Sequence, residues 1–428
     1  MAVAAPFGPA SARRAANAGR ARAPVAGVDV RWAYVAILVA VLPLFGQTFH
    51  YVKMLPPLWA LSKAFPIVSL PLCLLLFAGP RPPGGRQMLL SILWLILVPS
   101  FISLFTFEQT FFVALTSQVK LLSLIYFFSF LALLRWLLPS LRELAFAFLI
   151  CAAITFALLV IVWALAPQSA YAQHYVAGDA PVLAVDARGN RIRLPMYFGL
   201  IGVLYAWRRF LASPRIGWLL VWAGGFMLIF SLVRMRTYVL GLALTAAITA
   251  FVVAPPRIKI ALAALIPFAL AGLFSVPYMA SIFSTDKAFA FDVRYISTMK
   301  AIAFLGTDPF RWIFGVGSIS PIDPAGMMTY FNHFFFLADI TWMGILFEFG
   351  VVGAILIAAI PARGALLMHQ LRGRHDTPFL AALQDYLIYG LLISEMLPMT
   401  LAPGEVTTIM AIAVYGLERT RAQQAMTR

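Results

Sequence analysis

The chain has 428 residues, of which 62% are hydrophobic and only 11% are charged. A soluble domain is about half apolar and about a quarter charged, so this composition excludes a water-exposed surface over most of the chain. The net charge of +16 would suggest nucleic acid as the partner of a soluble protein. Most basic residues lie in short segments between apolar runs, so we interpret them as orientation signals and expect no nucleic-acid partner.

Residues 1–31 are rich in Ala, Gly, Pro and Arg and carry one acid, Asp29, which predicts a disordered basic tail. Apolar runs then recur as far as residue 418. About 20 apolar residues span a bilayer as a helix, so 32–418 is predicted to be an all-α, polytopic transmembrane bundle of about twelve spans. The predicted spans are 32–50, 56–79, 88–107, 111–134, 144–166, 194–211, 216–233, 237–255, 258–275, 345–366, 379–398 and 405–418.

Lys and Arg predict the orientation of these spans, because they are enriched in cytoplasmic loops. With the N-terminus in the cytoplasm, every inner segment is positive, and outer segments such as 106–111 and 399–404 contain no Lys or Arg. Both termini, including the 419–428 tail, are therefore expected in the cytoplasm and the bilayer is an expected partner. The residues that mark inner segments include Arg135, Arg142, Arg208, Arg209, Arg363 and Arg372.

Two outer segments do contain arginines. In 167–193, the sequence Arg188-Gly189-Asn190 predicts a turn within a short hairpin. The segment 276–344, between the ninth and tenth spans, is the longest stretch without a span. A membrane enzyme can build a site on such a loop, so 276–344 is the expected place for chemistry.

Basic residues on the outer side oppose the orientation rule, so something is expected to compensate them. A bound anion is one candidate, because guanidinium groups match phosphate oxygens in bidentate fashion. Pairing with nearby acids is the other candidate. The outer basic residues are Arg188, Arg191, Arg193, Arg234, Arg236, Arg294, Arg311, Lys53, Lys287 and Lys300, and the acids are Asp179, Asp186, Asp286, Asp292, Asp308 and Asp323.

Arg234 and Arg236 are the most informative pair, because they lie between two spans joined by almost no loop. Arginines at the hydrocarbon edge are costly unless they face a polar cavity or extend to the headgroups. Lys63 and Lys120 fall within spans, and Lys120 is expected to face the bundle interior. A functional role and a structural pair with a carboxylate or a helix carbonyl are both open for Lys120.

His333 is a candidate for proton transfer, and Asp339 and Glu348 supply alternative carboxylate bases. The sequence contains no CxxC, HExxH, Walker or GxGxxG motif, so we predict no metal site and no cofactor. Cys73 and Cys151 lie in apolar runs and are interpreted as small buried hydrophobic residues.

Four features follow one another along the chain. They are a Ser/Arg stretch that opens a small-residue helix at 231–250, Asp292-Val-Arg294 followed by Asp308-Pro-Phe and Gly315-Val-Gly317, Asn332-His333, and Glu348-Phe-Gly350-Val-Val-Gly353. In this order the sequence resembles the O-antigen ligase and polysaccharide polymerase superfamily, which is Wzy/WaaL-like. The motifs cover about 231–360, and the topology covers the whole chain.

The resemblance implies a metal-independent inverting glycosyltransferase in the bacterial inner membrane. Its donor would be an undecaprenyl-diphosphate-linked glycan at the periplasmic face, and its acceptor another glycan or lipid A core. Arg236 and Arg294 would hold the diphosphate, and His333 would activate the acceptor hydroxyl. We add Arg191 and Arg234 to the predicted diphosphate site, and Asp339 to the catalytic residues. Two guanidinium groups could replace a metal ion in stabilising the leaving diphosphate.

One departure favours one branch of this superfamily. Ligases tend to place a His-Asn pair about eight residues before the Glu-x-Gly, whereas Asn332 here precedes Glu348 by sixteen. Asp339-Ile-Thr-Trp-Met-Gly344 resembles the pattern of exopolysaccharide polymerases. We therefore expect a polymerase, with O-antigen ligase as the alternative, a chain-length regulator and export proteins as further partners, and a lipid-linked glycan flippase as the competing class.

Overall fold

The computed structural model describes residues 30–50, 52–76, 79–173, 181–186, 189–257, 259–260, 263–264, 289–320, 326–331, 335, 337–394 and 402–426. The predicted basic tail lies outside these residues except for its last two. Most of the predicted span 258–275 also lies outside them. Helices occupy the other predicted spans.

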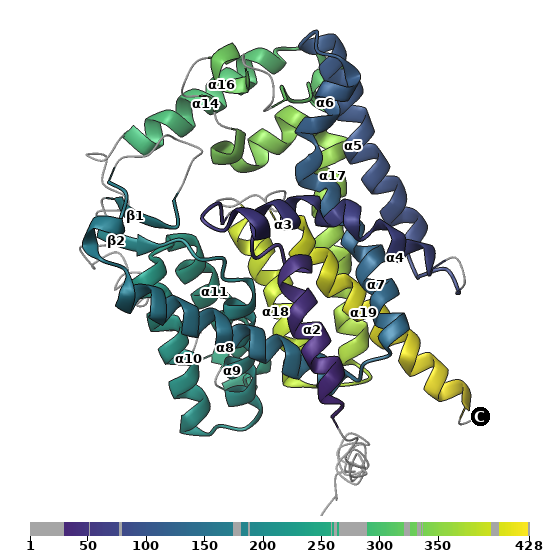
Figure 1. Ribbon diagram of the computed structural model, residues 1–428, viewed down its shortest axis with the longest axis vertical. Coiled ribbons are helices and arrows are strands. Elements are labelled where there is room, and N and C mark those ends of the chain that lie inside the picture. Colours follow the sequence, from purple (N-terminus) through teal and green to yellow (C-terminus); the bar gives the residue numbers. More distant parts are fainter. Residues whose placement is uncertain are drawn as a thin grey trace, which may run out of the picture.

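The helices form a bundle with an additional group of short helices beyond one of its ends (Figure 1). In the bundle, the helices are α2 (Trp32–Phe45), α3 (Pro56–Val68), α4 (Leu70–Leu74), α5 (Gly85–Thr106), α6 (Phe111–Ser117), η1 (Val119–Ile125), α7 (Tyr126–Leu137), α8 (Leu141–Leu165), α9 (Tyr197–Ala212), α10 (Ile216–Leu228), η3 (Ile229–Val233), α11 (Arg236–Val253), α17 (Thr341–Arg372), α18 (Pro378–Ile393) and α19 (Pro403–Met426). Between α8 and α9 lie η2 (Gln168–Ala170) and a hairpin of β1 (Leu183–Asp186) and β2 (Gly189–Ile192). The short helices are α14 (Phe289–Leu305), α15 (Pro309–Phe314), α16 (Gly326–Phe331) and η5 (Leu337–Ile340).

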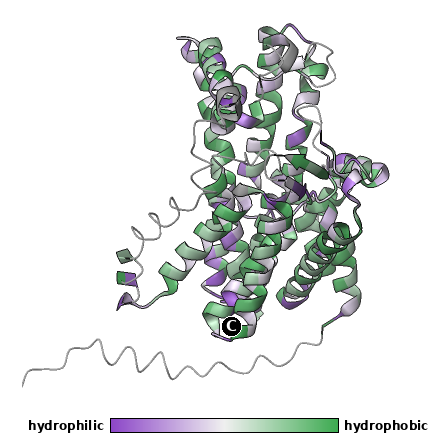
Figure 2. Ribbon diagram, turned by 90° about the vertical axis from the view of Figure 1, so that its left-hand side faces the viewer, coloured by the Kyte–Doolittle hydropathy of each residue, from purple (hydrophilic) through white to green (hydrophobic). Residues whose placement is uncertain are grey.

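Within the described part of the chain, six helical segments are long and apolar enough to cross a membrane. Hydrophobic residues cover most of their length (Figure 2). The only sheet among the described residues is the two-stranded hairpin. The protein is therefore an all-α, membrane-embedded protein. The six segments are Pro56–Leu74, Gly85–Thr106, Val119–Leu137, Leu141–Leu165, Ile216–Val233 and Leu337–Arg372.

The last helix of the chain, α19, is the central one. Its stretch 406–417 is buried throughout and packs against α17, α7 and η1. Small residues such as Gly416 permit this approach, because a Cβ there would lie 2.6 Å from a methyl group of Leu371. α19 also continues to Met426, where the sequence predicted a tail from 419.

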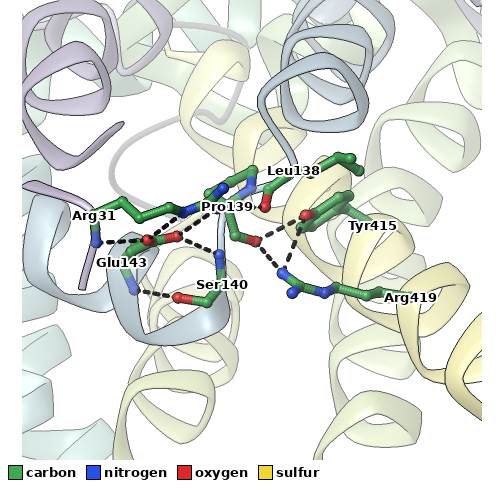
Figure 3. Close-up of polar contacts among 7 residues, drawn as sticks. All are labelled: Arg31, Leu138, Pro139, Ser140, Glu143, Tyr415 and Arg419. Carbon is green, nitrogen blue, oxygen red and sulfur yellow. Dashed lines mark hydrogen bonds and ion pairs between the residues drawn. The ribbon is translucent and has the colours of Figure 1, made fainter. Parts of the chain in front are cut away.

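One end of the bundle is held by a polar cluster at residues 138–143 (Figure 3). The Ser140 hydroxyl and the Glu143 carboxylate form a capping box at the start of α8. Arg31 donates to both oxygens of this carboxylate, at 3.0 and 3.1 Å, and to the carbonyl oxygen of Leu138 at 2.8 Å. The start of α2 is thus fixed to the α7–α8 connection.

The same connection also binds the C-terminal helix. Tyr415 and Arg419 of α19 both donate to the carbonyl oxygen of Pro139, at 2.8 and 2.5 Å (Figure 3). We call the end of the bundle where Arg31 and Arg419 lie the clasp end, and the opposite end the hairpin end.

One predicted inner-loop charge lies inside the bundle. Arg208 belongs to α9, is buried, and pairs with the fully buried carboxylate of Asp385 on α18. Two parallel N–H···O bonds of 2.5 Å join them. Arg208 lies within the predicted span 194–211, and the structure adds that this predicted inner-side charge is buried and paired in α9, which ends at Ala212.

The short helices have a hydrophobic cluster of their own, separate from that of the bundle. Phe335, Ile340 and Phe347 are buried in it, together with Ala301 and Leu305 of α14. These helices fall in the segment 276–344, which was predicted to lie outside the bilayer.

Candidate functional site

The hairpin presents two arginines on one face. Side chains alternate between the faces of a strand, and Ile192 is buried, so Arg191 and Arg193 lie on the other face. Both arginines are half-buried. The predicted hairpin is confirmed, although residues 187–188 of its turn, including Arg188, lie outside the described part of the chain.

Arg234 lies in the connection between α10 and α11, directly after the π-helical turn η3. Its φ is 54°, in the left-handed region, which costs a residue with a Cβ about 1–2 kcal/mol. Its amide donates to Ile229 O at 3.0 Å, and its side-chain Nε donates to Ser231 O at 2.8 Å. π-helical turns and strained backbone recur at functional sites, and here they fix the direction of the Arg234 side chain.

Gly189 shows how the hairpin and this turn meet. A Cβ at Gly189 would lie 2.6 Å from Nη1 of Arg234. Positions 189, 191 and 193 share one face of the strand, so the Arg234 guanidinium lies at the face that carries Arg191 and Arg193. The structure therefore brings together two predicted diphosphate-binding residues, Arg191 and Arg234, and adds Arg193 to them.

The other predicted site residues lie elsewhere or are not described. Arg236 is the first residue of α11, and its side chain is outside the described part. His333 lies outside the described residues altogether. Arg294 on α14 and Asp339 on η5 are both exposed, and these two elements pack against each other.

Glu348, the alternative base, is engaged in a pair. Lys120 donates to its Oε2 at 2.5 Å, and Gln118 donates to its Oε1 at 3.1 Å. The Glu348 side chain is 4% exposed and that of Lys120 is 32% exposed. Of the two roles left open for Lys120, the structure therefore shows a pair with a carboxylate. Asp339 is the more accessible of the two carboxylates.

Two of the glycine motifs contact each other directly. Gly350 has a φ of 66° and interrupts α17, and Gly315 has a φ of 80°. A Cβ at Gly315 would lie 2.6 Å from both Glu348 O and Gly350 N. Val316 and Gly317 donate to the carbonyl oxygens of Phe347 and Glu348, at 2.8 and 3.1 Å. These motifs therefore position the backbone around Glu348.

The Asp308-Pro motif has a local structural role. Asp308 caps α15 by accepting from Phe310 N at 2.9 Å, and its carboxylate lies 3.6 Å from Arg311 Nε. Arg311 also donates to Phe304 O at 2.6 Å. Arg311 is thus compensated by a nearby acid, as the alternative to anion binding predicted.

Lys63, the other predicted intramembrane charge, contacts His50. Lys63 Nζ lies 2.8 Å from His50 Nε2 in the turn that follows α2. A protonated Lys63 can only donate, so His50 accepts this hydrogen bond through Nε2.

Sequence reasoning missed a half-buried carboxylate at the start of α19, that of Glu405. Glu405 accepts a hydrogen bond from Tyr386, and its main-chain oxygen accepts from Tyr197 at 3.3 Å. The available sequence signal, at Glu405 and also at Asp385, was a single acid within an apolar run, which indicates a partner or a functional role.

No group of three His, Cys, Asp or Glu side chains that could hold a metal ion occurs among the described residues. The chain matches no protein-family model, and no curated protein is similar to it. The described residues thus bring the guanidinium groups of Arg191, Arg193 and Arg234 together at the hairpin end, and they place an exposed carboxylate, Asp339, on the group of short helices. Guanidinium groups can bind a phosphorylated ligand, and an exposed carboxylate can accept a proton.

Proposed function

We propose that the protein is a polysaccharide polymerase that joins undecaprenyl-diphosphate-linked repeat units at the periplasmic face of a bacterial inner membrane. The observation that supports this proposal best is the position of Arg234. It stands on a strained turn between two apolar helices, beside Arg191 and Arg193. A diphosphate on a membrane-bound lipid needs cationic groups at this depth, because its charge stays at the bilayer edge while its chain enters the hydrocarbon.

The chemistry follows from these groups. In the reaction, the acceptor hydroxyl attacks the anomeric carbon, and the bond to the diphosphate oxygen breaks with inversion. Arg191, Arg234, Arg236 and Arg294 stabilise the negative charge that builds on the diphosphate. Asp339 accepts the hydroxyl proton, a role for which its exposure suits it better than the paired Glu348.

The orientation belongs to the same proposal. With about twelve spans, both termini lie in the cytoplasm. Arg31, near one terminus, and Arg419, near the other, both contact the α7–α8 connection at the clasp end. Reporter fusions after about residue 180 and about residue 320 should report the periplasm, and fusions after residues 212 and 372 the cytoplasm. A cytoplasmic signal from the 276–344 segment would end the proposal.

The activity test uses purified protein with a lipid-linked repeat unit as its only substrate. We expect a ladder of longer lipid-linked chains without any lipid A core. Arg234→Ala and Arg234→Lys should both lose most of the product, because Lys lacks the planar fork. Arg311→Ala is the matched control, because Arg311 pairs with Asp308, and it should retain the ladder. Product that appears only when lipid A core is added would identify a ligase instead.

A transporter is the second candidate, and two interrupted helices favour it. The segment α6–η1–α7 changes from α-helix to 3-10 helix at Val119, next to Lys120, and α17 is interrupted at Gly350. The Lys120–Glu348 pair joins these two breaks. Transporters bind substrates at such discontinuous helices. Movement of a fluorescent lipid-linked glycan across vesicles, with no chain growth, would support this class over a polymerase.

A further inference from the structure

A groove lies between α9, α10 and α11, with a volume of about 250 Å³. Its first wall is aromatic and is formed by Trp207 of α9 with Trp222 and Phe226 of α10. The ring centroids of Trp207 and Trp222 lie 4.9 Å apart, and those of Trp222 and Phe226 lie 5.6 Å apart. Trp207 is fixed by hydrogen bonds from Nε1 to Ala246 O at 3.2 Å and to Thr249 Oγ1 at 2.9 Å.

The second wall is formed by four alanines of α11: Ala243, Ala246, Ala247 and Ala250. Positions 236, 240, 243, 247 and 250 follow the period of 3.6 residues and share this face. The position of Arg236 is therefore at the start of the face that lines the groove. With a rise of 1.5 Å per residue, Ala243 lies about 10 Å and Ala250 about 21 Å below it along the helix.

Apolar side chains connect the groove with the arginine turn. Phe230 follows Phe226 by one helical turn and is 44% exposed, and Leu240 on the facing helix is 39% exposed. The turn with Arg234 follows Phe230 by four residues and leads into α11. The arginine turn and the groove thus lie along the same two helices, α10 and α11, within a membrane-embedded bundle.

We infer that this groove holds the polyprenyl chain of the donor, with the donor diphosphate at Arg234 and Arg236. The inference rests on the proposed function and specifies how the lipid part of that substrate is recognised. A linear apolar chain fits between flat rings and alanines, and each methylene group that leaves a polar environment adds binding free energy. The arginines supply the complementary charge for the headgroup at the correct end of the groove.

The first test fills the groove from its exposed side. Ala243→Phe and Ala247→Phe add bulk at exposed positions, and Leu244→Phe adds bulk to the same helix away from the groove as the control. Each variant is assayed with two donors that carry the same glycan diphosphate, one on a full-length polyprenyl chain and one on a short prenyl chain.

We expect the wild-type protein and Leu244→Phe to have a KM for the long-chain donor about tenfold below that for the short-chain donor, since burial of a few methylene groups gives that factor. The groove variants should lose this preference, because their KM for the long-chain donor rises toward that for the short-chain donor. An undiminished preference in both groove variants would overturn the inference.

The second test does not need catalysis, so it separates failure of the inference from failure of the proposed function. A polyprenyl diphosphate with a diazirine on its chain is photolysed with the membrane-embedded protein, and the labelled peptides are identified. We expect adducts at 222–226 and 243–250 that Ala247→Phe abolishes. Labelling elsewhere, or a groove occupied by phospholipid or by the chain's own residues, would overturn the inference even if polymerisation were observed.

Discussion

Inside the helical bundle, two cations form ion pairs with carboxylates, Arg208 with Asp385 and Lys120 with Glu348. Around the hairpin end, Arg294 is exposed, and Arg191 and Arg234 lie near a strained turn. A cation inside the hydrocarbon needs a carboxylate partner, whereas an arginine at the bilayer edge is also stabilised by water and headgroups and can bind an anion. The bundle cations should therefore contribute to stability, and those at the hairpin end to activity.

The largest effect is expected at Arg208 and Asp385. Asp385→Ala leaves a buried guanidinium without its carboxylate, which should lower the free energy of unfolding by about 3–5 kcal/mol. Thermal unfolding in lipid nanodiscs measures this loss. The double variant Arg208→Met with Asp385→Leu should recover most of it, because no isolated charge remains. Equal stability of Asp385→Ala and the wild type would contradict the expectation that the bundle cations contribute to stability.

The next effect concerns His50, whose Nε2 lies 2.8 Å from Lys63 Nζ. His50→Leu removes this acceptor, which should lower the free energy of unfolding by about 1–3 kcal/mol. His50→Gln keeps an acceptor and should lose less stability. Equal thermal unfolding of His50→Leu and the wild type would contradict the effect.

A smaller effect is expected at Lys120, because its side chain is 32% exposed. Lys120→Met should destabilise the protein by about 1–2 kcal/mol, since Glu348 then keeps only its bond from Gln118. Lys120→Met combined with Glu348→Gln should be closer to the wild type in thermal unfolding. If instead Lys120→Met unfolds normally but stops movement of a lipid-linked glycan, the transporter candidate gains support.

The smallest effect on stability is expected at Arg294. Arg294→Ala should change the free energy of unfolding by no more than about 0.5 kcal/mol, as for other exposed positions, and should still abolish chain growth. Arg311→Ala, which breaks an exposed pair with Asp308, should be similar in stability and should remain active. A stable and fully active Arg294→Ala protein would remove Arg294 from the proposed site.

The fold class and most helices could be predicted from the sequence, because long apolar runs admit only helices in a bilayer. The hairpin could also be predicted, from Arg188-Gly189-Asn190. The pairing partners of the charged residues inside the bundle could not be predicted. Lys120 and Glu348 are separated by 228 positions, and nothing local in either segment identifies the other.

Two further features depended on tertiary structure. Arg208 stands beside Arg209 near a helix end, a pattern typical of an inner loop, and only the packing of α9 on α18 reveals its partner Asp385. The contact between Gly315 and Gly350 explains two motifs that the sequence could only place in order. Of the predicted site, the structure unites Arg191 with Arg234, whereas the roles of Arg236, Arg294, His333 and Asp339 stay predictions.

The central position of α19 has a consequence for the biogenesis of the protein. Ribosomes release the N-terminal part of a chain first, so the helices around α19 enter the membrane before the helix that they enclose exists. During this interval the apolar surfaces of α7 and α17 are without their partner, and the carbonyl oxygen of Pro139 lacks Tyr415 and Arg419. The bundle therefore receives its innermost helix after α7 and α17 have been made, and a chain terminated before residue 403 would lack the helix at the centre of its core.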